Sequence, residues 1–199
     1  MKKFELTAES KINIFGKKLF RIKALISFGD VEEGETGGWI EKEENLEQSS
    51  GDAWVYGDAE VYGNARVSGN ARVYGNARVS GNARVSGDVR VYGNAGVSGN
   101  AGVSGDAEVY GNARVSGNAR VYGNADYTTI HGFGTQFRTT TFFQCEDKQI
   151  RVSCGCFLGT IPEFREQVKN TREGKIAEEY LMIADLMEKH FVKERESGE

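Results

Sequence analysis

The sequence predicts a mainly β protein with a parallel β-helix at its centre, a β cap before it and an α+β unit after it. Glycine occurs 26 times among 199 residues and proline once, which is far from average usage. Valine recurs every six residues from Val55 to Val121, in twelve hexads of the form V-[YS]-G-[ND]-A-x, with Val89 the only replacement at the alanine position. Because so short a repeat cannot hold two helices, each hexad is expected to be one strand and one corner of a β-solenoid.

Residues 1–48 are expected to form the N-terminal cap. The stretches KINIF and LFRIKALI alternate polar and apolar residues on either side of GKK, a pattern typical of a short hairpin. A glycine- and carboxylate-rich link follows, FGDVEEGETGGWIEKEENL. We interpret its glutamates as a solvated loop rather than a metal site.

Residues 49–126 are the predicted solenoid. Within a hexad, Ala and Val alternate with x and Tyr/Ser, so Ala and Val should point inward and the other two outward. Gly-Asn or Gly-Asp then turns the chain, since both residue types accept positive φ.

One face of the solenoid should carry tyrosines. Tyr56, Tyr74, Tyr92 and Tyr110 lie eighteen residues apart, which predicts three hexads per turn and a triangular prism of four coils. The other two faces carry mostly Arg and Ser, with bare glycine at positions 96 and 102. Because aromatic residues and arginine are enriched at interfaces, we predict an oligomer contact on the tyrosine face. Its residues would be Trp54, Tyr56, Arg72, Tyr74, Arg90, Tyr92 and Tyr110; a ligand or partner surface and simple ladder stacking are the alternatives.

Residues 127–199 are expected to form a C-terminal α+β unit that covers the open edge of the last coil. FRTTTFFQC and QIRVSCGCF flank the turn EDK and predict a β-hairpin. Thr160 and Glu163 have the spacing of a capping box that opens a helix. A second helix is predicted from about 175 to 193, with one apolar side made of Ile176, Tyr180, Ile183, Leu186, Met187 and Phe191.

The stretch SCGCFLGT before the capped helix is a candidate anion site, because small residues and a helix N-terminus expose backbone N–H groups. The predicted ligand-binding residues are Arg138, Arg151, Ser153, Gly155, Gly159 and Thr160; a tight strand-to-helix turn is the alternative. Cys145, Cys154, Cys156 and His131 carry zinc-ligand atoms, but Cys-x-Cys is not the usual ligand spacing, so no metal is expected.

The hexads resemble the left-handed β-helix of the hexapeptide-repeat family: Val61 with Ala65 and Val67 with Ala71 match its pattern of an aliphatic residue followed four later by a small one. The resemblance implies a left-handed coil and a homotrimer, and many such proteins are acyltransferases that use CoA thioesters. FGDVEEGETGGWIEKEENLEQSSGDAWVYG looks like uncharacterised bacterial members labelled as putative transferases. TTIHGFGTQFRTTTFF and IRVSCGCFLGTIPEF look like the tails of phage and prophage proteins.

The acyltransferase interpretation needs a histidine as base. The hexads hold none, and of the two histidines in the chain His190 suits a helix C-terminus. His131 is therefore the single candidate base, with capping or packing as its alternative role.

We expect a protein that is not an enzyme and needs no cofactor: a homotrimer that binds a small anionic, nucleotide-like ligand or a host protein. The alternatives are a CoA-dependent acyltransferase and a purely structural scaffold. A net charge of −4 speaks against nonspecific nucleic-acid binding. The absence of a long apolar run speaks against a membrane span, and three cysteines favour the cytoplasm.

Overall fold

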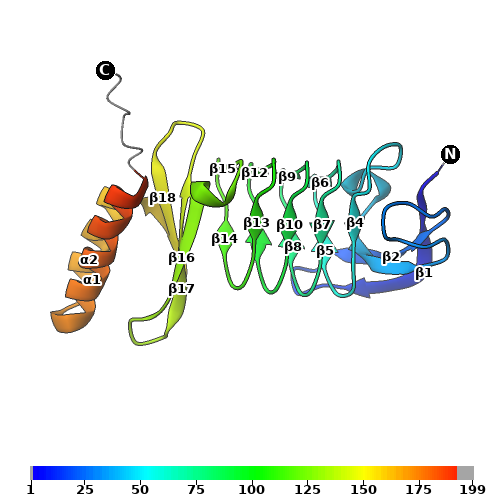
Figure 1. The fold of residues 1–199 in the computed structure, drawn as a ribbon. Coiled ribbons are helices and arrows are strands. Elements are labelled where there is room, and N and C mark those ends of the chain that lie inside the picture. The colour runs from blue at the N-terminus through cyan, green and yellow to red at the C-terminus, as the bar shows by residue number, and fades with distance from the viewer. Residues whose placement is uncertain (1, 192–199) are drawn as a thin grey trace, which may run out of the picture.

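A computed structural model describes residues 2–191 and shows an elongated molecule in three parts (Figure 1). A β-solenoid occupies the middle, an N-terminal group of strands closes one end, and a sheet with two helices closes the other. The predicted mainly β fold with a central β-helix is confirmed.

Twelve two-residue strands, one per hexad, build the solenoid. Strands three hexads apart pair in parallel with valine opposite valine, as in Val73 with Val91, so the predicted three-hexad turn is confirmed. The sheets have the orders β4-β7-β10-β13, β6-β9-β12-β15 and β5-β8-β11-β14. The strands are β4 (Trp54–Val55), β5 (Glu60–Val61), β6 (Arg66–Val67), β7 (Arg72–Val73), β8 (Arg78–Val79), β9 (Arg84–Val85), β10 (Arg90–Val91), β11 (Gly96–Val97), β12 (Gly102–Val103), β13 (Glu108–Val109), β14 (Arg114–Val115) and β15 (Arg120–Val121).

The interior of the coil is made of the hexad valines and alanines, which are at most 1% exposed, except for Ala125 of the last hexad, which lies exposed in the short helix that follows the coil. Each buried valine contributes about 1.5–3 kcal/mol before the entropy of ordering the chain is counted. The corners need glycine for two reasons. Gly81 has φ +69°, and a Cβ there would lie 2.9 Å from the backbone nitrogen of Gly99 in the next coil.

The coil begins before the first hexad. Strand β3 (Thr36–Ile40) pairs in parallel with β5, and Leu46 forms a parallel bridge with Val67. Ile40 and Leu46 are buried and stand in for hexad valines, which gives about five turns where the sequence predicts four. The short helix η1 (Glu43–Asn45) turns this extra coil, and buried Asn45 donates its side-chain amide to the carbonyls of Gly63 and Ala65.

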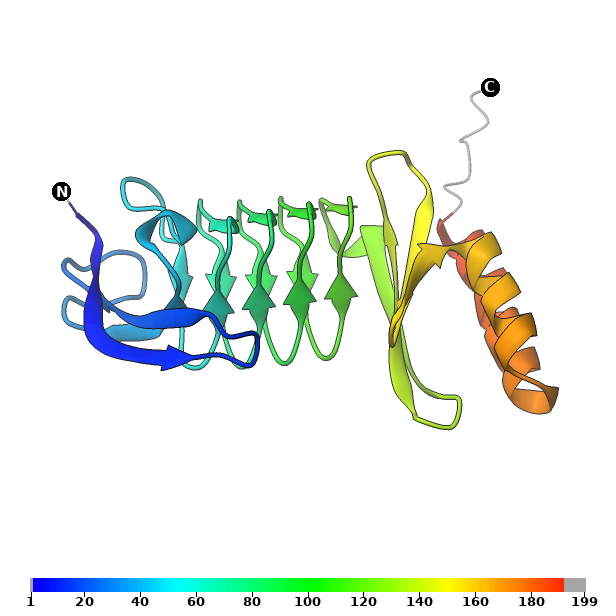
Figure 2. The same cartoon turned by 180° about the vertical axis from the view of Figure 1, so that it is seen from behind.

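The N-terminal cap contains the predicted hairpin, formed by β1 (Phe4–Ile12) and β2 (Lys18–Ala24). Strand β2 also pairs with β3, so the cap continues the sheet that contains β5, β8, β11 and β14. The hairpin runs along one side of the solenoid, as the view from behind shows (Figure 2).

The C-terminal unit is an antiparallel sheet of order β16-β17-β18-β19, preceded by the short helix η2 (Asn124–Asp126). Its elements are β16 (Tyr127–Phe133), β17 (Arg138–Gln144), β18 (Ile150–Cys154), β19 (Phe157–Thr160), α1 (Ile161–Thr171) and α2 (Gly174–Phe191). The predicted hairpin is β17 with β18, and both predicted helices are present. Residues 192–193, the predicted end of the second helix, lie outside the described residues.

The unit covers the last coil on one side and carries its helices on the other. The backbone N–H of Arg114 donates to the hydroxyl of Thr141 at 3.0 Å, and Ala119 bridges to Cys145. The predicted apolar side of α2 is wrong at Leu186, which is 58% exposed. Ala184 packs inward instead, because Tyr180, Ile183, Ala184 and Met187 form the row that faces the sheet and α1.

The capping box of α1 gives the first testable prediction. The Thr160 hydroxyl accepts from the backbone N–H of Glu163, and the Glu163 carboxylate accepts from the backbone N–H of Thr160. We expect Thr160→Ala to lower the free energy of unfolding by about 1 kcal/mol, measured by urea denaturation. Thr171→Ala in the same helix is the control, and an equal loss in both variants would contradict a specific capping effect.

Candidate functional site

A groove lies on one face of the solenoid, where the last coils meet the C-terminal sheet. Its floor is the sheet β5-β8-β11-β14 with the preceding corner, and one wall is the hairpin of β16 and β17. The cavity there has a volume of about 720 Å³. It is lined by Asn76, Arg78, Asn94, Asn112, Arg114, His131, Phe137, Arg138, Thr139, Gly155 and Cys156.

The groove is positively charged although the chain as a whole is acidic. Arg78, Arg114 and Arg138 line it, and within residues 2–191 no carboxylate does. Arg78 lies 3.6 Å from the Glu60 carboxylate, whereas Arg114 and Arg138 form no ion pair inside the described part of the chain. Two unneutralised guanidinium groups beside one hollow favour an anionic occupant.

A ladder of asparagines forms the edge of this groove. Asn76 donates its amide to Asn94, and Asn94 donates to Asn112, each at 3.3 Å. The ladder follows from the repeat, because the corner position stacks in every third hexad. It lines the groove with polar atoms whose positions are fixed by the coil.

His131 projects from β16 into the groove and is exposed. Its Nδ1 lies 3.1 Å from the Thr139 hydroxyl of the facing strand, which fixes the ring beside Arg138. A histidine base is usually oriented by a carboxylate, and among residues 2–191 the lining of this groove offers none. The arrangement suits hydrogen bonding to an anion better than proton abstraction.

The structure brings together two of the six predicted ligand-binding residues. Arg138 and Gly155 share the groove, and the Arg138 guanidinium lies directly over Gly155, in the space that a Cβ would occupy. Gly155 and Cys156 form the two-residue turn between β18 and β19, with φ +61° at the glycine. The close approach of Arg138 therefore depends on a residue without a side chain.

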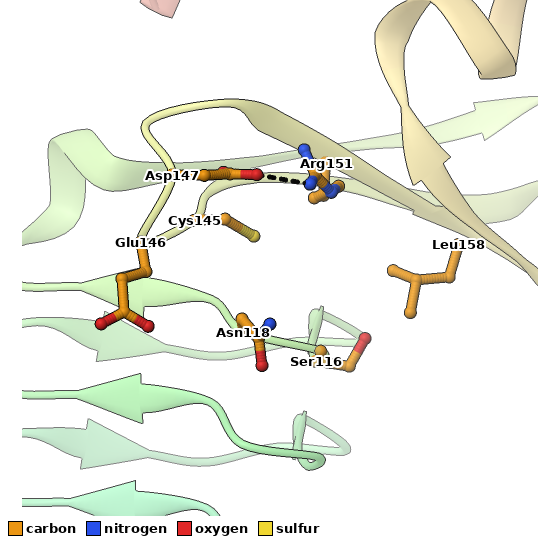
Figure 3. Close-up of a pocket in the computed structure, with 8 residues that line it drawn as sticks. Ser116, Asn118, Cys145, Glu146, Asp147, Arg151 and Leu158 are labelled. Carbon is orange, nitrogen blue, oxygen red and sulfur yellow. Dashed lines mark hydrogen bonds and ion pairs between the residues drawn. The ribbon is translucent and has the colours of Figure 1, made fainter.

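Arg151 lies outside this groove. It pairs with Phe143 near one end of β17, whereas Arg138 pairs with Phe133 at the other end of that strand. Five residues along a strand separate the two arginines by roughly 17 Å. Arg151 pairs with Asp147 at 2.6 Å and lines a second cavity of about 400 Å³ (Figure 3). Glu146 and Asp147 flank that cavity, so the prediction that both arginines hold one anion is wrong.

The predicted anion site at the start of α1 is already filled by the protein. The Glu163 carboxylate accepts from the Thr160 backbone N–H at 2.7 Å and from its hydroxyl at 2.8 Å. These bonds lower the pKa of Glu163, so the carboxylate is charged and disfavours a second anion. Gly159 is crowded by the Phe157 ring and Ser153 is buried. The alternative, a tight strand-to-helix turn, is not what the structure shows either, because strand β19 lies between the Gly155–Cys156 turn and α1.

The three cysteines differ in burial and in the groups that they contact. Cys145 is buried, which raises the pKa of its thiol. Cys154 accepts a hydrogen bond from the Thr140 hydroxyl, and Cys156 is exposed in the groove. Within residues 2–191 no group of three or more His, Cys, Asp or Glu is arranged to hold a metal ion.

The predicted tyrosine stripe is shorter than expected. Trp54 is fully buried beneath the cap, with its ring 5.5 Å from that of Phe28 and 6.1 Å from that of Phe4, so its place on an exposed interface is wrong. Burial beside Asp30 raises the pKa of Tyr56 to about 12. The remaining ladder consists of the half-buried Tyr74 and Tyr92 and the exposed Tyr110.

These three rings stack on each other along the face. The ring centroids of Tyr74 and Tyr92 are 4.9 Å apart at an interplanar angle of 1°, and those of Tyr92 and Tyr110 are 5.3 Å apart. Burial raises the pKa of both Tyr74 and Tyr92, so their hydroxyls stay protonated. Arg72 pairs with Asp30 and Arg90 with Glu108, which leaves this face locally neutral.

Sequence reasoning missed Asn76, Arg78, Asn94, Asn112 and Arg114 as site residues. The repeat places them in two outward rows, and those rows are readable from the spacing alone. No local signal shows that residues of the β1–β2 and β16–β17 hairpins line the hollows of this face rather than of another.

Comparison with known proteins supports the solenoid. The chain matches the family model described as YdcK Beta solenoid repeat over residues 59–75, 71–87, 77–93, 83–99 and 107–123. The matches lie inside the hexad region and leave the cap and the C-terminal unit unmatched. No curated protein matches the chain. Within the described residues, no helix is long and apolar enough to cross a membrane.

Proposed function

We propose that this β-solenoid repeat protein is a non-catalytic binding protein for a small anionic ligand, held in the groove between the solenoid and the β16–β17 hairpin. One observation carries the proposal: Arg114 and Arg138 project into a groove lined by no carboxylate of residues 2–191, and no ion pair within those residues neutralises them. A charge-assisted hydrogen bond from a guanidinium to a phosphate or carboxylate is stronger than one between neutral groups.

Two rigid elements define the groove. The solenoid fixes Arg114 and the asparagine ladder at the spacing of its coils, and the C-terminal sheet fixes Arg138 and His131. The Thr139 hydroxyl holds the imidazole ring. Preorganised donors of this kind raise affinity because less ordering remains to be done on binding.

The test uses isothermal titration calorimetry with tripolyphosphate and ATP at low ionic strength. We expect the double variant Arg114→Ser/Arg138→Ser to bind both probes at least about tenfold more weakly. Added salt should weaken binding to the wild type, since exposed charges are screened. The matched control is Arg66→Ser/Arg84→Ser, which removes the same charge from exposed arginines of the neighbouring sheet. No binding of either probe up to millimolar concentration, or an equal loss in the control, would refute the proposal.

Acyl transfer is the second candidate, because His131 lies in the same groove as Arg138 and a CoA thioester carries phosphates. Acetyl-CoA is therefore the third probe. Release of free CoA by the wild type and not by His131→Gln would assign catalysis and overturn the non-catalytic proposal.

The finer assignments rest on the resemblance to the hexapeptide-repeat family and to phage proteins. We propose on that basis a left-handed coil and a homotrimer whose subunits contact through the tyrosine ladder. The protein would bind a nucleotide-like signal of a host cell, or would bind and block a host defence protein. The three free cysteines favour a cytoplasmic location.

A further inference from the structure

No contact within residues 2–191 explains why position 96 is a glycine. Its place in the hexad is x, which elsewhere holds Arg, Glu or Asp, with Gly102 the one other glycine. Its backbone is not in the left-handed region, and an added Cβ would meet nothing within 4 Å. Glycine inside a strand weakens it by roughly 0.5–1 kcal/mol and often marks the close approach of a ligand or another backbone.

At Gly102, by contrast, a contact within the chain explains the glycine. The Arg120 side chain lies across it, with its Cδ 3.5 Å from the position of an added Cβ. Arg120 continues to the Asn100 carbonyl at 2.9 Å and the Glu146 carboxylate at 3.0 Å. The neighbouring face therefore covers its glycine with its own arginine, whereas Gly96 is left open.

Gly96 lies in a hollow that continues the proposed anion groove. This hollow has a volume of about 520 Å³ and shares Arg78, Asn94 and Arg114 with the groove. Its far wall is the tip of the β1–β2 hairpin, where Phe15 lies 6.0 Å from the Tyr62 ring and is 61% exposed. In the sheet register Gly96 lies between Arg78 and Arg114.

We infer that the ligand is a nucleotide whose base lies on the bare backbone at Gly96, beside Phe15, while its phosphates lie at Arg114 and Arg138. The inference deepens the proposed function and rests on it. A planar base needs flat, uncluttered space and an aromatic neighbour, since bases stack on aromatic side chains in proteins. Phosphates need the guanidinium groups on the adjoining side. The two connected hollows offer these two environments side by side.

The experiment compares Gly96→Gln with Gly102→Gln, the same change at the same hexad position of the adjacent face. Glutamine adds no charge and both residues lie in β-strands, so both variants should keep the circular dichroism spectrum of the wild type. Gly96→Gln should melt no lower than the wild type, since nothing lies within 4 Å of its added Cβ, whereas in Gly102→Gln the new side chain meets Arg120, so the melting temperature of that control is measured to verify that it is folded. The probes are ATP and tripolyphosphate, measured by calorimetry. We expect the wild type to bind ATP roughly tenfold or more tightly than tripolyphosphate.

Gly96→Gln should lose that preference, binding ATP at least about tenfold more weakly while tripolyphosphate affinity stays within about twofold. Gly102→Gln should behave as the wild type, and Phe15→Ser should weaken ATP selectively. Unchanged ATP affinity in Gly96→Gln would overturn the inference, as would equal wild-type affinities for the two probes. In either case the proposed function stands if Arg114→Ser/Arg138→Ser still loses tripolyphosphate binding. If the wild type binds neither ATP nor tripolyphosphate, both the nucleotide inference and the proposed function are overturned.

Discussion

Trp54→Ala is expected to lower the free energy of unfolding by about 3–5 kcal/mol, the range for removing a large buried aromatic side chain. Trp54 is 0% exposed, and its ring contacts Phe4 and Phe28 edge to face. The change leaves a cavity between the first coil and the strands that cover it. Because neighbouring coils of a solenoid stabilise each other, the loss should extend from the cap into the first turns.

Chemical denaturation followed by circular dichroism measures this effect. Limited proteolysis adds a local readout, since the cap of the variant should be cleaved before the solenoid. The control is Tyr110→Ala, an aromatic residue of the same face that is 51% exposed, for which a change below about 1 kcal/mol is expected. A loss for Trp54→Ala no larger than that of the control would show that the cap does not stabilise the coil through this ring.

The solenoid itself was predictable because its determinants repeat locally. Backbone alternation and φ preferences explain the repeat of six residues. They place valine and alanine inward, glycine and asparagine at the corners, and tyrosine on one face. The additional coil was not predictable in this way, because Ile40 and Leu46 occupy valine positions without the surrounding hexad. Their inward placement depends on stacking against Val61 and Val67, which are distant in sequence.

The residues of the anion groove were harder to predict from the sequence. Gly155 and Arg138 were identified, but Arg151 was wrongly grouped with them: counting outward from the predicted EDK turn already places Arg151 near the turn and Arg138 at the far end of the hairpin. Asp147, which lies in the turn four residues before Arg151, forms an ion pair with it. Arg114 was visible as an outward residue, and its importance depends on a hairpin that begins more than ten residues later in the chain.

Replacing Tyr74 and Tyr92 together by serine is expected to convert the proposed homotrimer into single chains. The proposed trimer would have three times the 21.9 kDa mass of one chain, and multi-angle light scattering distinguishes the two. Both tyrosines point outward from the coil and contribute their rings to the ladder rather than to the valine and alanine core. Serine is the residue that other hexads carry at this position, so the coil should remain folded.

Self-association through the tyrosine ladder is expected because the charged residues beside it are neutralised by ion pairs. Arg90 is paired with Glu108 at 2.7 Å and Arg72 with Asp30 at 2.8 Å, so like copies do not repel one another across this face. Aromatic rings of this kind are frequent anchors of protein interfaces. Tyr122→Ser, which changes a 62% exposed tyrosine on a different face, is the matched control and should remain trimeric. A double variant that stays trimeric would exclude the ladder as the contact, and a wild type with the mass of one chain would leave the ladder as stacking within a single coil.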